Sequence, residues 1–187
     1  FNASSPLALL RIPGREPAEI KLIPPGSTAP DGSAGPSSGG ALTALGYPPA
    51  ASGRKGQFQW IRQQGAQGFE YCIGLETARA DEATLVAIAI TSSRDDRQPL
   101  RLARRRCATA LDQGYDRTLA GHVDWWRQFW SASDVVLPDS EQAISRQYHL
   151  VQYFHGAASR QGAPPMPLQG VWTADNGGLP PWKGDYH

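Results

Sequence analysis

The chain has 187 residues and a formal net charge of +1, because 18 Lys and Arg residues nearly balance 17 Asp and Glu residues. This balance argues against a nucleic-acid binder or a polybasic membrane protein, since both concentrate far more positive charge. Hydrophobic residues make up 40% of the chain, which is enough for a buried core and excludes disorder throughout. The longest apolar run, Leu85 to Ile90, has the length of a strand and is far too short for a membrane span.

Two short apolar segments open the chain, Leu7 to Ile12 and Ala18 to Ile23, and we expect both to be strands that end at proline-containing turns. Residues 24–56 are mostly Pro, Gly, Ser and Ala. Such residues bury too little apolar area to offset the entropy lost on ordering. We therefore expect a long disordered loop at 24–56.

After this loop the hydrophobic residues alternate with a period of two, as in half-buried strands. Phe58 and Trp60 alternate with glutamines, and the alternation returns from Phe69 to Leu75. The segment from Thr84 to Thr91 is apolar on both faces, which suits a strand inside a sandwich.

From Pro99 onward the hydrophobic spacing is helical, and Gly114 is placed to end the first helix. A second helix is expected to open near Asp116, whose carboxylate suits the free amides of a first turn. A third helix is expected to begin at a cap formed by Asp139 or Ser140 and to run to about Arg160. Its apolar face is so wide that we expect it to be covered on most sides. Strands followed by helices indicate the α+β class.

The most conspicuous charge cluster is a run of arginines, at positions 101, 104, 105 and 106. The favoured interpretation is a solvated helix face with salt bridges to Asp95 and Asp96. A nucleic-acid patch is the alternative, but one such run in a chain of net charge +1 is a poor electrostatic footprint.

Signatures of a nucleophile, of a phosphate-binding loop and of a zinc-binding helix are all absent. Cys72 and Cys107 are too few for a disulfide scaffold or a structural zinc site, and whether they pair stays open. His149 and His155 lie six residues apart and so on different faces of a helix, which does not suit joint metal ligation. The sequence therefore predicts no metal site and no cofactor.

Aromatic residues are concentrated between His122 and Trp130. Trp126 and Trp130 are four residues apart, as are Trp125 and Phe129, so they form two adjacent ladders on a helix. Packing is the favoured role of these ladders, and a platform for a sugar ring is the alternative.

A second cluster, from Leu168 to His187, is rich in Gly and Pro and is expected to be a loop that displays aromatic and polar side chains. Binding is the favoured role of this loop, and plugging of a core is the alternative.

The order and spacing of these motifs resemble glycoside hydrolase family 95, whose best-known members are inverting α-L-fucosidases. The motifs are His122, Trp126 and Phe129-Trp130, then Ser159-Arg160-x-Gly162, Pro164-Pro165, Leu168-Gln169-Gly170-x-Trp172 and Pro181 to His187. The match is specific from Tyr115 to His187 and suggestive from Phe58 to Ser93.

The resemblance implies three parts of a longer enzyme. Residues 1–98 would be the C-terminal part of a β-sandwich domain, and residues 99–138 a helical linker. Residues 139–187 would be the start of a truncated (α/α)6 catalytic barrel. Because the chain begins with Phe1 and its last residues look like the middle of a motif, we expect an internal piece of a longer protein.

The activity that the resemblance implies is exo-acting hydrolysis of α-L-fucosides or related sugars with inversion. A Glu acts as the general acid and an Asp activates water, with carboxyl groups roughly 6.5–9.5 Å apart. Those positions lie further along the family's sequence, so no catalytic residue is assigned and this chain alone is expected to be inactive.

The substrate-binding residues implied by the resemblance are Trp172, Trp182, Asp185, Tyr186 and His187, and the expected partner is an oligosaccharide or glycoside rather than a nucleic acid or a membrane. Fucosidase-type members carry a small polar residue after the Trp-x pair, whereas this chain has Trp182-Lys183-Gly184. Another deoxy or galacto-configured sugar therefore fits as well.

Families of this kind commonly act outside the cytoplasm, which implies a secreted or periplasmic protein. The alternative function is a non-catalytic carbohydrate-binding or interdomain structural module.

Overall fold

The computed structural model describes residues 2–14, 16–23 and 46–159. It divides into two compact units, Phe1–His122 and Val123–His187. The boundary falls inside a helix, so each unit is described by itself. The described residues have mixed α+β structure, as the order of the sequence patterns predicts.

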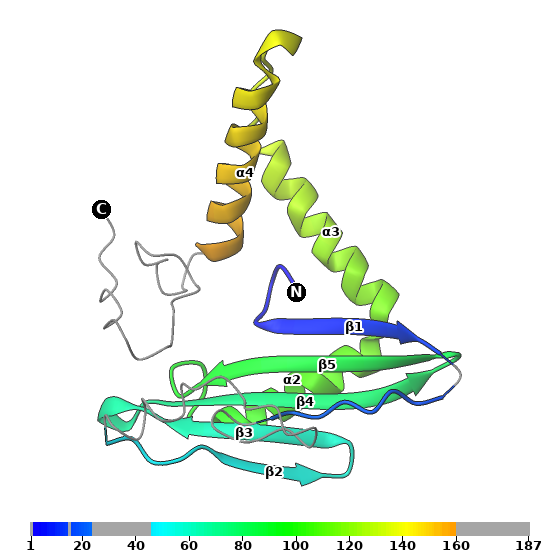
Figure 1. The fold of residues 1–187 in the computed structure, drawn as a ribbon, viewed down its shortest axis with the longest axis vertical. Helices are drawn as coiled ribbons and strands as arrows, with labels where there is room; N and C mark the ends of the chain where they lie inside the picture. Colours follow the sequence, from blue (N-terminus) through cyan, green and yellow to red (C-terminus); the bar gives the residue numbers. More distant parts are fainter. Residues whose placement is uncertain (1, 15, 24–45, 160–187) are drawn as a thin grey trace. The chain divides into compact units, whose positions relative to one another are not determined.

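The first unit contains a five-stranded antiparallel sheet (Figure 1). Its strands are β1 (Leu7–Pro13), β2 (Ala51–Lys55), β3 (Phe58–Gln64), β4 (Glu70–Ala80) and β5 (Ala83–Ser92). The strand order is β1-β5-β4-β3-β2, so only β1 pairs with a strand distant in sequence. The sheet therefore forms largely from neighbouring hairpins.

The prediction of a strand from Ala18 to Ile23 is wrong, because this segment forms no regular element. A side chain of the sheet forms hydrogen bonds with the backbone of this segment instead. The Leu22 amide donates to Gln59 Oε1 at 3.0 Å, and Gln59 Nε2 donates to the Ile20 carbonyl oxygen at 2.7 Å. With its backbone groups bonded to a side chain, the segment needs no strand partner.

The predicted disordered loop is also wrong in part, because β2 lies inside it as an edge strand. Residues 24–45 of that loop lie outside the described residues. Gly53 of β2 is opposite Trp60 of β3, and a Cβ on Gly53 would lie 2.5 Å from Cζ2 of the indole. A residue typical of loops is thus required here, since only glycine lets the ring lie on the strand backbone.

Helix α2 (Pro99–Gln113) packs across one face of the sheet. As predicted, it begins at Pro99 and stops at Gly114, which has a φ of 79°. Small residues allow a close approach, since Ala103 of the helix lies directly over Gly74 of β4. The core between helix and sheet is formed by Leu7, Phe58, Cys72, Ala87, Ala89, Ala103, Cys107 and Ala110.

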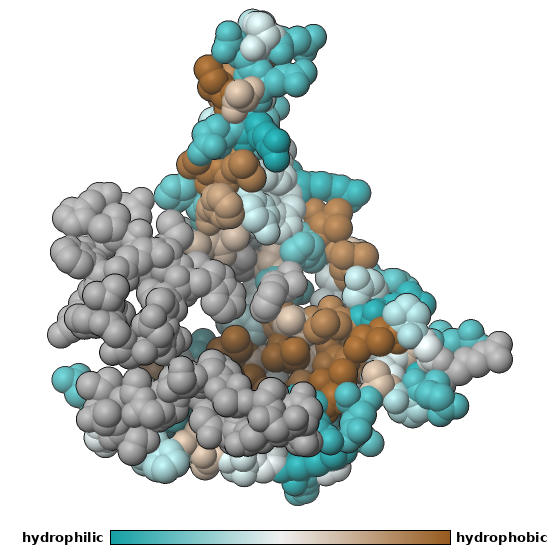
Figure 2. Space-filling view, viewed as in Figure 1, coloured by the Kyte–Doolittle hydropathy of each residue, from teal (hydrophilic) through white to brown (hydrophobic). Residues whose placement is uncertain are grey.

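The opposite face of the sheet is also apolar. Ile61, Leu75 and Val86 are buried there, whereas Leu10 is 43% exposed and Ile90 is 48% exposed. Figure 2 shows hydrophobic side chains gathered over the sheet in this view. The prediction that β5 is apolar on both faces is therefore confirmed. The described residues form one sheet and do not show the predicted β-sandwich. Helix α2 covers one face of this sheet, and no second sheet covers the other face within the described residues.

The second unit contains the end of α3 (Tyr115–Ser131), a short 3-10 turn (Asp139–Glu141) and α4 (Gln142–Ala158). The predicted third helix exists, but neither Asp139 nor Ser140 caps it. The residue before it is Glu141, which makes no side-chain cap hydrogen bond. Since the described part of the chain holds only three α-helices, it does not show an (α/α)6 barrel.

Aromatic packing joins α3 to α4 within this unit. The rings of Trp126 and Tyr153 stack at 5.2 Å between centroids, and Trp130 lies 5.9 Å from His149. The ring of Phe129 lies on Gly156, where a Cβ would be 2.6 Å from Cζ. The predicted packing is thus confirmed for Trp126, Phe129 and Trp130, which contact α4.

The outer side of α4 contradicts one prediction. Ile144, Val151 and Phe154 are exposed, so α4 is not covered on most sides by the residues that the structure describes. The wide apolar face read from the sequence is present, but only part of it contacts α3.

Candidate functional site

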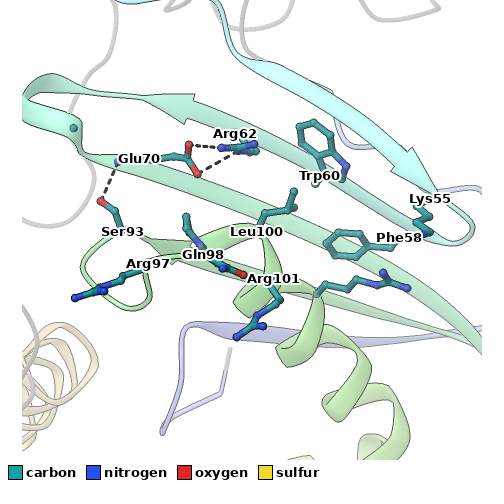
Figure 3. A pocket seen from close by; sticks show the side chains of 13 residues that line it. Lys55, Phe58, Trp60, Arg62, Glu70, Ser93, Arg97, Gln98, Leu100 and Arg101 are labelled. Atoms are coloured by element: carbon teal, nitrogen blue, oxygen red, sulfur yellow. Dashed lines mark hydrogen bonds and ion pairs between the residues drawn. The ribbon is translucent and has the colours of Figure 1, made fainter.

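A groove of about 570 Å³ opens on the α2 side of the sheet, within the first unit (Figure 3). It lies where the β2–β3 edge meets the amino end of α2. Its lining consists of Lys55, Phe58, Trp60, Arg62, Gly68, Glu70, Ser93, Arg97, Gln98, Pro99, Leu100, Arg101 and Arg104. These residues come from three strands, two connecting segments and one helix, so the groove exists only in the folded sheet.

The apolar part of the groove is held rigidly. Phe58 is buried and belongs to the core, and Leu100 packs against the same core. Trp60 is half-buried beside them, and Gly53 supports the opposite side of its indole ring. Figure 3 shows Lys55, Phe58 and Trp60 at one end of the groove. A planar aromatic surface is therefore available at a fixed position.

The other end of the groove contains an ion pair. Arg62 donates to both carboxylate oxygens of Glu70, with Nη2–Oε2 at 2.6 Å and Nε–Oε1 at 3.2 Å. The hydrogen bond to Glu70 raises the pKa of the Arg62 guanidinium. The backbone amide of Glu70 also donates to Ser93 Oγ at 3.1 Å. A carboxylate fixed in this way serves as a structural partner of β3 and is badly placed for general acid–base work.

The arginine run predicted from the sequence divides into two groups. Arg105 lies 3.9 Å from Asp96, and Arg106 lies 4.0 Å from Asp95. The predicted salt bridges are confirmed for these two arginines. The other two, Arg101 and Arg104, line the groove instead.

Four cations of the lining have no ion pair or hydrogen bond among the described residues: Lys55, Arg97, Arg101 and Arg104. They outnumber the single carboxylate of the lining, which Arg62 already occupies. The groove therefore combines an aromatic surface with a positive charge that no other group in residues 2–14, 16–23 and 46–159 neutralises.

The amino end of α2 is fixed at the groove by a buried hydrogen bond. Thr91 Oγ1 donates to the carbonyl oxygen of Pro99 at 2.8 Å. Gln98 precedes the helix and gives no side-chain cap, while Pro99 occupies the first turn. The helix dipole thus adds to the positive potential of this region.

The substrate-binding residues predicted from the sequence all lie outside the described residues: Trp172, Trp182, Asp185, Tyr186 and His187. The groove was not predicted from the sequence. Its only signal was the spacing of Arg101 and Arg104, which lie three residues apart and so share a helix side.

The two cysteines are free and fully buried. Burial raises the pKa of Cys72 to about 11 and that of Cys107 to about 12. The question left open by the sequence is settled, since they do not pair. Protonated thiols without access to solvent are unreactive, so neither is a candidate nucleophile.

In residues 2–14, 16–23 and 46–159, no group of three or more His, Cys, Asp and Glu side chains is placed to hold a metal ion. No helix there combines the length and the hydropathy that crossing a bilayer requires.

Comparison with protein-family models, with curated protein sequences and with solved structures found no match for this chain.

Proposed function

We propose that this chain is part of an inverting glycoside hydrolase, exo-acting on α-L-fucosides or related sugars, and that its catalytic carboxylates lie elsewhere in the enzyme. The observation that carries the proposal is the ordered series of motifs between His122 and His187. Single motifs of this kind recur in many proteins, but their order and spacing together are characteristic of the family that the chain resembles.

The arrangement of the first unit supports the fold expected for such an enzyme. An antiparallel sheet precedes the helices, and the face opposite α2 exposes Leu10 and Ile90. Exposed apolar side chains on a sheet favour a further layer. We propose that this layer is the second sheet of a β-sandwich in the complete enzyme.

The helices support the remaining part of the proposed architecture. The segment of α2 and α3 would be the linker, and α4 would be the first helix of an (α/α)6 barrel. The exposed side chains of Ile144, Val151 and Phe154 suit a helix with further helical neighbours.

We further propose that Trp172, Trp182, Asp185, Tyr186 and His187 line the sugar cleft. An indole face stacks on the apolar face of a pyranose, and the polar groups hydrogen-bond its hydroxyls. In the complete enzyme, Trp182→Ala is expected to raise KM and lower kcat. Unchanged turnover and binding would contradict this assignment.

Hydrolysis itself is tested with nitrophenyl glycosides. The complete enzyme is expected to release nitrophenol from the α-L-fucoside or a related deoxy or galacto-configured glycoside, and proton NMR should detect the β-anomer first. The 187-residue chain alone should release none above buffer. Turnover by the chain alone, or a first product with retained configuration, would refute the proposal.

The alternative function is a non-catalytic carbohydrate-binding module. The observation that favours it is the groove, because Trp60 offers an aromatic surface beside polar side chains. Failure of hydrolysis in the complete protein, together with saccharide binding by this chain, would favour the module.

A further inference from the structure

We propose that the groove between the β2–β3 edge and the amino end of α2 binds an acidic saccharide, with the carboxylate or sulfate groups held by arginines and one sugar ring against Trp60. The choice of a carbohydrate rests on the proposed function. The position of the site and the sign of its ligand's charge come from the groove alone.

The charge argument begins with the cations that have no partner in the described part of the chain. Arg97 precedes α2 and Arg101 lies in its first turn, whereas Lys55 lies beside Phe58 at the other end of the groove (Figure 3). Arg104 follows Arg101 on the same helix and also lines the groove. Four cations in the lining of one groove create a positive potential, which a bound anion lowers. A neutral sugar would leave it in place, so the lining favours a ligand with negative groups.

The type of cation indicates which negative groups the ligand carries. Three of the four cations that lack a partner among the described residues are arginines, whose planar guanidinium donates two parallel hydrogen bonds to a carboxylate or a sulfate. Arg101 and Arg104 lie on one side of α2, one helical turn apart. Such a spacing suits charged groups on a ligand that extends along the groove.

The aromatic part of the groove further restricts the class of ligand that fits. Trp60 is half-buried, so part of the ring remains accessible beside the cations, while Gly53 fixes its other side. Gln98 and Ser93 add an amide and a hydroxyl for the hydroxyl groups of a sugar. A volume of about 570 Å³ falls within the range of small-ligand sites, about 300–1,000 Å³.

Single-stranded nucleic acid also combines negative charge, on its phosphates, with flat rings, in its bases, but it fits the groove less well. Its binding sites stack successive bases on several aromatic side chains along an extended basic channel. Here one indole is accessible, since Phe58 is buried in the core. The chain as a whole carries a net charge of only +1.

The experiment is calorimetric titration of the 187-residue chain with trigalacturonate and with its methyl ester, which has the same rings without charge. A sulfated galacto-oligosaccharide of the same length distinguishes sulfate from carboxylate as the anionic group. We expect a Kd below about 1 mM for one or both acidic ligands, the upper end of ordinary substrate affinities. We expect at least tenfold weaker binding of the ester, and weaker binding of the acid as salt screens the cations.

Variants of α2 locate the site. Arg101→Gln combined with Arg104→Gln is expected to weaken binding of the acidic ligand about tenfold, since each exposed ion pair contributes up to about fivefold. Arg105→Gln is the matched control on the same helix, because Arg105 pairs with Asp96 and does not line the groove. Trp60→Phe should weaken the acid and the ester alike.

Several results would overturn the inference. These are the absence of binding by both acidic ligands, equal binding of acid and ester, an equal effect of Arg105→Gln, and tighter binding of an oligothymidylate than of either saccharide. None of them bears on hydrolysis by the complete enzyme, so the inference and the proposed function can fail separately.

Discussion

Gly74 tests whether α2 packs on the sheet as closely as the structure shows. A Cβ at this position would lie 2.8 Å from Cε2 of Phe58, 3.0 Å from its Cζ and 3.1 Å from the Cβ of Ala103. Favourable carbon contacts are about 3.5–4.0 Å. Phe58 and Ala103 are both in the buried core, so neither has free space in which to move.

The expected magnitude follows from two opposing effects. Overpacking of a rigid core costs about 1–3 kcal/mol. Replacing glycine by alanine within a strand returns roughly 0.5–1 kcal/mol of backbone entropy. Gly74→Ala should therefore lower the free energy of unfolding by about 1 kcal/mol, and by at most about 2.5 kcal/mol.

Urea denaturation followed by far-ultraviolet circular dichroism measures this change. The control is Gly121→Ala in α3, where a Cβ would meet nothing within 4 Å, and it should stabilise the protein by about 0.5–1 kcal/mol. The double variant Gly74→Ala/Phe58→Leu should lose less than the sum of its single variants. Stabilisation by Gly74→Ala similar to that of Gly121→Ala would refute the close packing of α2 on β4.

Three further predictions test other contacts. Thr91→Val should cost about 1 kcal/mol of stability, because Thr91 is 1% exposed and its hydroxyl donates to Pro99; an unchanged urea midpoint would argue against that bond. The free energy of unfolding should fall above pH 9, by about 1.4 kcal/mol per pH unit for each thiol. The reason is that thiols of the unfolded chain lose their protons at the ordinary pKa of 9.0, whereas burial in the folded protein raises the pKa of Cys72 to about 11 and that of Cys107 to about 12. Cys107→Ala should flatten this slope, and an identical slope in both proteins would contradict the burial of the thiol. Gly156→Ala should weaken the α3–α4 contact, where a Cβ would lie 2.6 Å from Cζ of Phe129, and near-ultraviolet dichroism of the aromatic residues would report its loss.

Much of the local structure was predictable because it depends on neighbours in the sequence. The helix that ends at Gly114 and the two-faced strand from Thr84 to Thr91 are both present. The segment from Ala18 to Ile23 was predicted wrongly because its apolar pattern says nothing about the glutamine that binds its backbone. β2 was missed because an edge strand of small and polar residues forms only when β3 is there to pair with it.

The candidate site was the least predictable part. Arg101 lies 31 residues after Glu70 in the sequence, and no periodicity relates it to Lys55 or Trp60. Pairing of Glu70 with Arg62 rather than with Arg97 or Arg101 also depends on the register of β3 and β4.

The sequence by itself determined the α+β class, the limits of α2 and the two apolar faces of β5, because propensity and hydrophobic period act over a few residues. Only the tertiary structure decided which arginines are neutralised and which line a groove. Strand order and helix packing set the distances between groups that are far apart along the chain, and electrostatic pairing depends on those distances.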